Sequence, residues 1–148
     1  KEIPSAQLLI LGEGDERSSL ENIVFDLKLV SNVRFLGFVD NPFQYISRSD
    51  VLALSSDFEG FGNVIVEALS LGVPVVSTDC PSGPSEILDS DDLGILVPVE
   101  NAPVLGRSIL DVLTNSSFDA SLLKERASFF SVDNAADHYQ RIVWSCTQ

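Results

Sequence analysis

Two glutamates, Glu59 and Glu67, are the residues of this sequence with the most evident capacity for chemistry. They flank a glycine-rich segment that runs into an apolar stretch predicted to be helical. Glu67 follows Asn63 by four residues, which places both on one face of that helix, whereas Glu59 precedes the helix. Ionised carboxylates accept several hydroxyl hydrogen bonds, so the pair would suit a polyhydroxyl ligand in one crevice. An ordinary glutamate on a partly exposed helix remains the alternative for Glu67.

The start of this helix is a second candidate feature. Asn63 is of a residue type that caps helices and is predicted to be the N-cap. The backbone N–H groups behind a cap have no partner in a preceding turn, and they favour anions or hydroxyls.

The segment Gly12-Glu13-Gly14 follows a predicted strand and precedes a predicted helix, as the first glycines of a dinucleotide fingerprint do. The third glycine of that pattern is absent, because Arg17 stands in its place. A tight strand-to-helix turn explains the segment equally well. In an intermediate interpretation, Gly12 lies near a bound nucleotide, but this loop does not bind it.

A stiff segment, residues 77–87, combines small hydroxyl residues with two prolines and a glycine, and it suits phosphate or sugar contacts. It contains Cys80, a conceivable nucleophile. The single histidine, His138, lies far along the chain, and we expect it to be an ordinary helix residue. No spacing of His, Cys, Asp and Glu indicates a metal site.

Short apolar runs alternate with amphipathic stretches, a pattern typical of a parallel sheet. We predict one α/β domain over residues 1–148, Rossmann-like, with helices on both faces of the sheet. Ligands of such sheets bind beyond the carboxyl ends of the strands. The predicted strands are 8–11, 33–36, 51–54, 74–77 and 94–97, and the predicted helices lie at 20–27, 42 onward, 64–71, 85 onward, 105–113, 122–130 and 133–144.

The composition excludes several classes of function. The 148 residues carry 9 Lys and Arg against 22 Asp and Glu, a net charge of -13, which argues against nucleic acids and anionic membranes as partners. No apolar run approaches the ~20 residues that a membrane-spanning helix needs. Two cysteines favour neither a disulfide framework nor a metal knuckle, and they fit a reducing, cytoplasmic setting.

The segment 59–76, EGFGNVIVEALSLGVPVV, resembles the E-x7-E signature of retaining glycosyltransferases of family 4, which have the GT-B fold. Segments 9–14 (LILGEG), 33–39 (VRFLGFV) and 50–56 (DVLALSS) resemble strands of that family in order and spacing. Segment 80–88 (CPSGPSEIL) resembles a variant found in bacterial envelope-polysaccharide enzymes. The resemblance covers about residues 7 to 114.

This resemblance implies the C-terminal, donor-binding half of a two-domain enzyme. Glu59 would contact hydroxyls of the donor sugar, and Glu67 those of the nucleotide ribose. The remaining implied contacts come from the backbone amides of Phe61, Gly62 and Asn63, which would face sugar and diphosphate, and from Gly37, Phe38 and Val39, which would lie against the base.

The resemblance further implies metal-independent, cofactor-free transfer from a nucleotide-diphosphate sugar with retention at the anomeric carbon. A saccharide or lipid-linked acceptor would bind an N-terminal domain, in the cytoplasm or peripherally at the inner membrane. The family's Arg–Lys pair, which neutralises the diphosphate, lies upstream of the motifs found here. We therefore expect the 148 residues to be a fragment, inactive alone.

Two alternatives of similar architecture remain. A nucleotide-sugar 2-epimerase would typically use histidines in its cleft, and no histidine follows a predicted strand. A phospho-receiver domain is also acidic and parallel α/β, and Asp57 does follow a strand. It needs a lysine after the last strand, but none occurs between Lys28 and Lys124.

Overall fold

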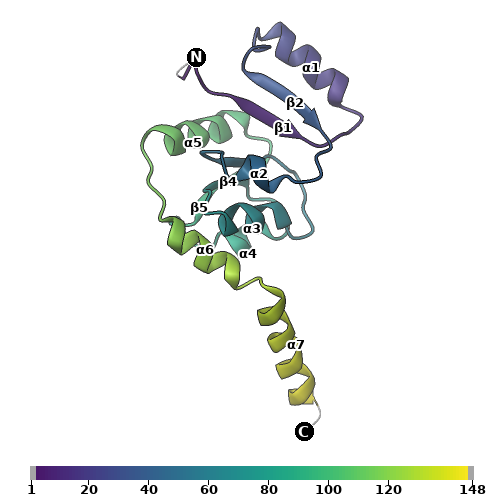
Figure 1. Ribbon diagram of the computed structural model, residues 1–148, viewed down its shortest axis with the longest axis vertical. Helices are drawn as coiled ribbons and strands as arrows, with labels where there is room; N and C mark the ends of the chain where they lie inside the picture. Colours follow the sequence, from purple (N-terminus) through teal and green to yellow (C-terminus); the bar gives the residue numbers. More distant parts are fainter. Residues whose placement is uncertain (1–2, 147–148) are drawn as a thin grey trace. The chain divides into compact units, whose positions relative to one another are not determined.

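The computed structural model describes residues 3–146, in which strands and helices alternate along the chain (Figure 1). The chain divides into two units, Lys1–Pro42 and Phe43–Gln148, and each is described by itself.

The first unit is a strand–helix–strand motif. Strand β1 (Leu8–Leu11) and strand β2 (Val33–Gly37) pair in parallel, with Leu8 opposite Val33 and Ile10 opposite Phe35. Helix α1 (Arg17–Asp26) connects them. Two parallel neighbours require such a crossover, because a tight hairpin can join only antiparallel strands.

The second unit is built on a three-stranded parallel sheet in the order β3-β4-β5. Val75 of the central strand pairs with Leu52 on one side and Gly94 on the other. The elements of this unit are β3 (Leu52–Leu54), β4 (Val75–Thr78), β5 (Gly94–Val97), α2 (Phe43–Ile46), α3 (Asn63–Ser70), α4 (Pro84–Ile87), α5 (Ala102–Thr114), α6 (Ala120–Ser128) and α7 (Val132–Cys146).

Strand β4 is buried on both faces, which explains why its sequence is apolar without alternation. Val75 belongs to a core with residues of α3 and α6, such as Leu69 and Leu123. Val76, which points to the opposite face, belongs to a second core with Val112 of α5. The sheet is therefore the middle layer of a three-layer arrangement, and its central strand, from which the 79–83 loop leaves, is its best-buried strand.

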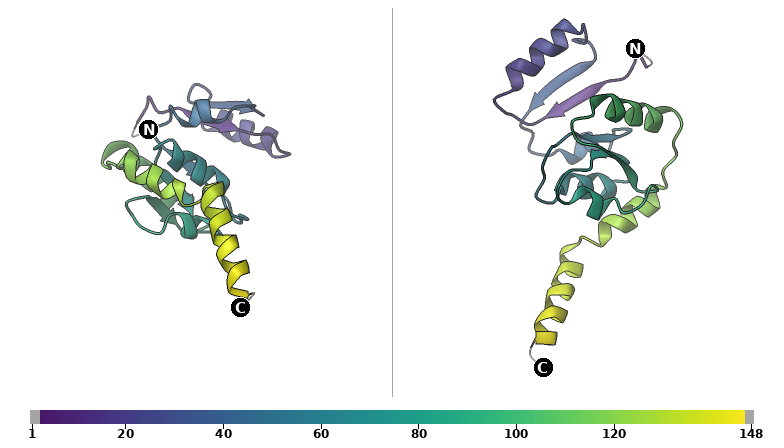
Figure 2. Two further views of the ribbon diagram at one scale, coloured as in Figure 1. Left: turned by 60° about the horizontal axis from the view of Figure 1, so that its bottom comes forward. Right: turned by 180° about the vertical axis from the view of Figure 1, so that it is seen from behind.

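Helix α7 is exposed over residues 132–145 and projects from the end of α6 (Figure 2). Its apolar side chains include Tyr139, which is 72% exposed. Among the described residues, no helix is both long and apolar enough to cross a membrane.

The predicted α/β class with parallel strands is confirmed, and every predicted strand and helix is present within a few residues of its predicted bounds. The hydrogen-bonded ladder of the first unit is β1-β2, and that of the second unit is β3-β4-β5. That both belong to one sheet stays a prediction.

Helix α3 ends at a glycine. Gly72 lies just past the last helical turn with φ of +77°, where its N–H donates to the carbonyl of Leu69 and that of Val73 donates to Ala68. This pair of bonds is a Schellman motif. A Cβ atom at Gly72 would lie 2.9 Å from the Cβ of Ala120 on α6, so the glycine also permits close packing of α3 on α6.

We predict that Gly72→Ala lowers the free energy of unfolding by about 2 kcal/mol, because it combines a left-handed backbone with a collision. Gly106→Ala is the matched control, since Gly106 lies inside α5 with open space around its Cβ position. That change should leave stability equal or raise it by up to ~1 kcal/mol. Urea unfolding followed by circular dichroism measures both, and equal effects would contradict the packing argument.

Candidate functional site

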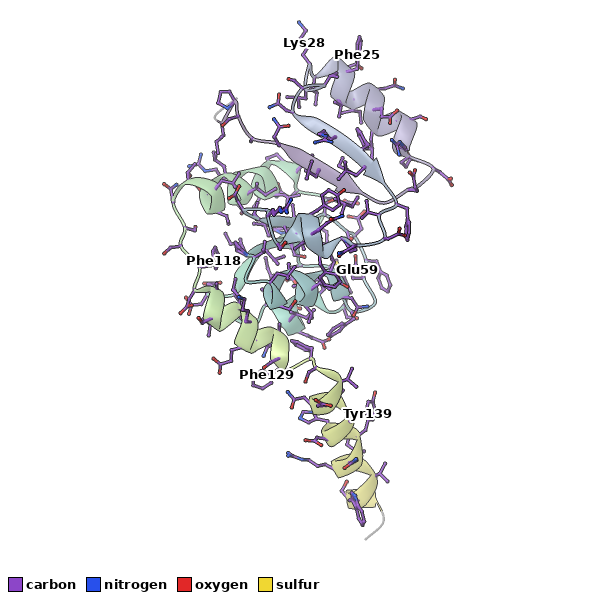
Figure 3. The ribbon with its side chains drawn as sticks, viewed as in Figure 1. Phe25, Lys28, Glu59, Phe118, Phe129 and Tyr139 are labelled. Atoms are coloured by element: carbon purple, nitrogen blue, oxygen red, sulfur yellow. The ribbon has the colours of Figure 1, made fainter. Side chains whose placement is uncertain are left out.

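The candidate site lies in the second unit, where strands β3 and β4 end. Parallel strands finish at the same edge of a sheet, so the loops that follow them become neighbours. The loop of residues 55–62 carries Glu59 and leads into α3 (Figure 3), and the loop of residues 79–83 leads into α4.

The backbones of the two loops pair at Glu59. Its N–H donates to the carbonyl of Pro81, and its own carbonyl accepts from the N–H of Ser82, both at 3.1 Å. This reciprocal pairing fixes the main chain of Glu59 to the neighbouring loop.

The carboxylate of Glu59 is also held. The Ser56 hydroxyl donates to Oε1 of Glu59 at 2.7 Å, and Thr78 at the end of β4 donates its hydroxyl to the backbone carbonyl of Ser56. The side chain of Glu59 is half-buried, whereas Thr78 is 4% exposed. A buried hydroxyl on the central strand therefore supports the residue that orients the carboxylate.

Gly83 allows the second contact between the loops. Its φ is +101°, and a Cβ atom there would collide with the backbone carbonyl group of Phe61. The ring of Phe61 meets that of Phe130 edge to face, with centroids 5.4 Å apart. The segment from Glu59 to Phe61 therefore lies between the 79–83 loop and the chain beyond α6.

The prediction that Asn63 caps α3 is wrong. Gly62 occupies the N-cap position with φ of +84°, Asn63 is the first helical residue, and no side chain caps this helix. The left-handed turn at the cap position favours glycine, which moves the helix start by one residue. Since no side chain caps them, the first backbone N–H groups of α3 retain the capacity to bind an anion or a hydroxyl.

Glu67 lies on α3 and is half-buried, opposite the fully buried residues Ile65, Ala68 and Leu69. Its side chain has no hydrogen-bond partner among residues 3–146, although its backbone carbonyl accepts from Ser70. The four-residue spacing does put Asn63 and Glu67 on one side of the helix. That Glu59 and Glu67 face one crevice stays a prediction.

The other predicted donor-binding residues belong to the first unit. Gly12 donates its N–H to the carbonyl of Gly37 at 2.8 Å, so the first residue after β1 is joined to the last residue of β2. Phe38 is 79% exposed and Val39 is half-buried. A role for Gly12, Gly37, Phe38 and Val39 at the nucleotide stays a prediction.

Arg17, which replaces the third glycine of the fingerprint, is engaged within the first unit. Its guanidinium contacts Glu21 and Glu13 at 2.9 Å each and lies over the ring of Phe35. Hydrogen bonds from Glu21 and then Glu13 raise the pKa of Arg17 above its ordinary value. Its charge is thus balanced by two carboxylates of the first unit.

Several supporting residues carry no recognisable sequence signal. Arg126 of α6 donates to the carbonyls of Ile87 and Glu86 at the end of α4, at 2.8 and 2.6 Å. It also pairs with Asp89 at 3.0 Å and lies over the ring of Phe130. Arg126 is about 40 residues along the chain from α4, and Phe130 is about 70 residues from Phe61. Sequence patterns of one chain do not reveal contacts at that separation.

The described residues include no cluster of three or more His, Cys, Asp or Glu side chains that could hold a metal ion. Cys80 is buried, and His138 lies on the exposed helix α7. A surface hollow of about 380 Å³ contains none of the predicted site residues, and it is lined by Asp91, Asp92, Ser116, Ser117, Phe118, Asp119 and Leu122.

Residues 1–128 match the family model described as "Glycosyl transferases group 1". The chain belongs to this family. The match favours sugar transfer over the epimerase and phospho-receiver alternatives.

Relatives of the chain include bacterial glycosyltransferases. The chain is 33% identical over 120 residues to the lipopolysaccharide core biosynthesis glycosyltransferase LpsE of Rhizobium meliloti, covering 81% of this chain and 35% of the relative. It is 34% identical over 117 residues to the poly(glycerol-phosphate) alpha-glucosyltransferase of Bacillus subtilis, covering 79% and 17%. The chain therefore spans about a third or less of the length of these relatives.

Solved structures share the fold. Anabaena HepE, in complex with UDP, superposes with a TM-score of 0.81 at 27% identity, over 97% of this chain and 42% of that one. The apo form of the lipopolysaccharide outer core galactosyltransferase WaaB gives 0.85 at 23% identity, over 94% and 40%. The α/β architecture is thus that of GT-B glycosyltransferases.

We predict that Arg126→Ala lowers the free energy of unfolding by about 2 kcal/mol, because it removes a part-buried charged hydrogen bond to the carbonyl of Ile87 and an exposed one to that of Glu86. The control is Arg107→Ala, whose side chain is 67% exposed and pairs with Asp111 at 3.4 Å. That loss should be at most about 0.5 kcal/mol. Chemical denaturation of both variants measures the difference, and a small effect at Arg126 would contradict its supporting role.

Proposed function

We propose that this chain forms the donor-binding part of a retaining glycosyltransferase of family 4. The enzyme would transfer a sugar from a nucleotide-diphosphate sugar to a saccharide or lipid-linked acceptor. The observation that carries the proposal is the carboxylate of Glu59, oriented at the carboxyl edge of the parallel sheet in a chain of this family.

Each polar group of the site has a proposed role. Glu59 accepts hydrogen bonds from hydroxyls of the donor sugar, and Glu67 accepts them from the ribose. The backbone amides of Phe61, Gly62 and Asn63 face the sugar and the diphosphate. Fixed amide dipoles of this kind favour the negative charge that develops on the leaving diphosphate.

The proposed reaction is a transfer at the anomeric carbon of the donor sugar. An acceptor hydroxyl forms a bond with that carbon while the bond from the carbon to the diphosphate oxygen breaks. The electron pair leaves with the nucleotide diphosphate, and the proton of the acceptor hydroxyl passes to the departing diphosphate oxygen. We propose that this transfer retains the anomeric configuration and requires no metal ion, as in the family whose signature the chain resembles.

The printed names of relatives suggest substrate classes. One relative, from Campylobacter jejuni, is named as a galactosaminyltransferase acting on a diphospho-undecaprenol saccharide, and it is 41% identical over 95 residues. The HepE structure holds UDP. We therefore propose a UDP-sugar donor and an envelope saccharide acceptor, with the reaction in the cytoplasm or at the membrane surface facing it.

For Glu67 we predict that replacement by alanine weakens binding of UDP and of UDP-sugars alike, by about tenfold, because the ribose belongs to both ligands. Isothermal titration of the complete gene product with UDP and with UDP-N-acetylglucosamine, UDP-galactose and UDP-glucose measures this. Glu125→Ala, at an exposed position of α6, is the matched control and should bind as the wild type does. Unchanged affinities in Glu67→Ala would refute the ribose assignment.

For Glu59 the pattern should differ. Glu59→Ala should leave the affinity for UDP within about twofold and remove most of the extra affinity that the sugar contributes, because this carboxylate is proposed to touch only the sugar. Sugar transfer should fall by about 100-fold or more, as expected when a group that interacts with the reacting sugar is lost. Equal losses for UDP and UDP-sugar would contradict the sugar assignment.

A further inference from the structure

We propose that Ser56 is a positioning residue, which holds the carboxylate of Glu59 in the orientation that receives the donor sugar. The inference rests on the proposed function of Glu59 and extends it to a residue that does not itself touch the donor. Three observations carry it: the hydrogen bond between the two side chains, the attachment of Ser56 to the central strand, and the fixed backbone of Glu59.

The first observation defines the orientation. The hydroxyl of Ser56 donates to Oε1 of Glu59 at 2.7 Å, a usual separation for an O–H···O hydrogen bond. An ionised carboxylate only accepts hydrogen bonds, so this direction of donation is unambiguous for the charged form. Oε2 has no hydrogen-bond partner among residues 3–146. One oxygen is thus held, and the other remains available to a sugar hydroxyl.

The second observation explains why Ser56 can hold its position. Its backbone carbonyl accepts the hydroxyl of Thr78, the last residue of β4, which is 4% exposed. The preceding residue, Ser77, is fully buried and donates its hydroxyl to the carbonyl of Thr78. Ser56 is therefore anchored to the best-buried strand of the sheet, although it lies in a loop.

The third observation limits what Ser56 can do. The backbone of Glu59 is already fixed by its two hydrogen bonds to Pro81 and Ser82. The freedom left to Glu59 is rotation within its side chain, and the hydroxyl of Ser56 removes it. Ordering a flexible glutamate opposes binding, so a carboxylate ordered beforehand binds the sugar more tightly.

Stabilisation of the loop would be a different role for the same contact. If Ser56 merely stabilised the loop, its loss would weaken every interaction of the site, including those with the nucleotide. If it acts through Glu59, its loss should affect only the contribution of the sugar. The ratio of the dissociation constant for UDP to that for a UDP-sugar separates the two roles, and UDP binding itself reports an intact fold.

The experiment compares four variants of the complete gene product by isothermal titration with UDP, UDP-N-acetylglucosamine, UDP-galactose and UDP-glucose. We expect Ser56→Ala to reduce the ratio by about three- to tenfold with UDP affinity unchanged. Ser56→Thr keeps a hydroxyl and should retain most of the ratio. Thr78→Val, which removes the anchoring hydroxyl at nearly constant volume, should reduce it less than Ser56→Ala. Ser55→Ala, an exposed hydroxyl of the same loop, should change nothing.

A double-mutant cycle completes the test. In a Glu59→Ala background, Ser56→Ala should have no further effect on the ratio, because a positioning residue acts only through its target. Additive effects, or an equal loss of UDP and UDP-sugar affinity in Ser56→Ala, would overturn the inference and leave the proposed function standing. A wild type that binds none of these ligands, or an unchanged ratio in Glu59→Ala, would overturn the proposed function and the inference with it.

Discussion

The backbone pairing between Glu59 and the Pro81–Ser82 segment is the interaction on which the rest of the candidate site depends. Strand β3 is only three residues long, and the loop after it could not hold a carboxylate in place unaided. By pairing with the loop that follows β4, it becomes part of the structure around the central strand. The parallel topology makes this possible, because it brings the ends of β3 and β4 to one edge.

A hydroxyl group, rather than a cation, contacts the carboxylate of Glu59. Ser56 contacts it, Thr78 supports Ser56, and no ion pair involving Glu59 occurs among residues 3–146. A salt bridge would satisfy the carboxylate and compete with a ligand, whereas a single hydroxyl leaves acceptor capacity unused. This arrangement suits a sugar, and it agrees with a domain of net charge -13 whose acidic residues would bind hydroxyls.

The sequence predicted the elements well because periodicity and apolar runs are local properties. A glycine just past a helix, such as Gly72 after α3, is a local signal of the same kind. The sequence failed at the start of that helix, where Asn63 has the better capping side chain but Gly62 has the required backbone conformation. It also gave no indication of Ser56 as a partner of Glu59, because small hydroxyl residues are common in loops and the contact depends on the turn between them.

The contacts that the sequence could not reveal are those that cross the unit. Phe61 packs on Phe130, and Arg126 lies over the ring of Phe130 while it donates to the carbonyl of Ile87 at the end of α4. Gly83, the N-cap residue of α4, lies close to the backbone of Phe61. These contacts link the 55–62 loop, α4 and α6 to one another. We expect them to be cooperative, because displacement of one residue leaves the others with unpaired carbonyls or exposed rings. The shape of the site therefore depends on α6 as much as on the strands that carry its carboxylate.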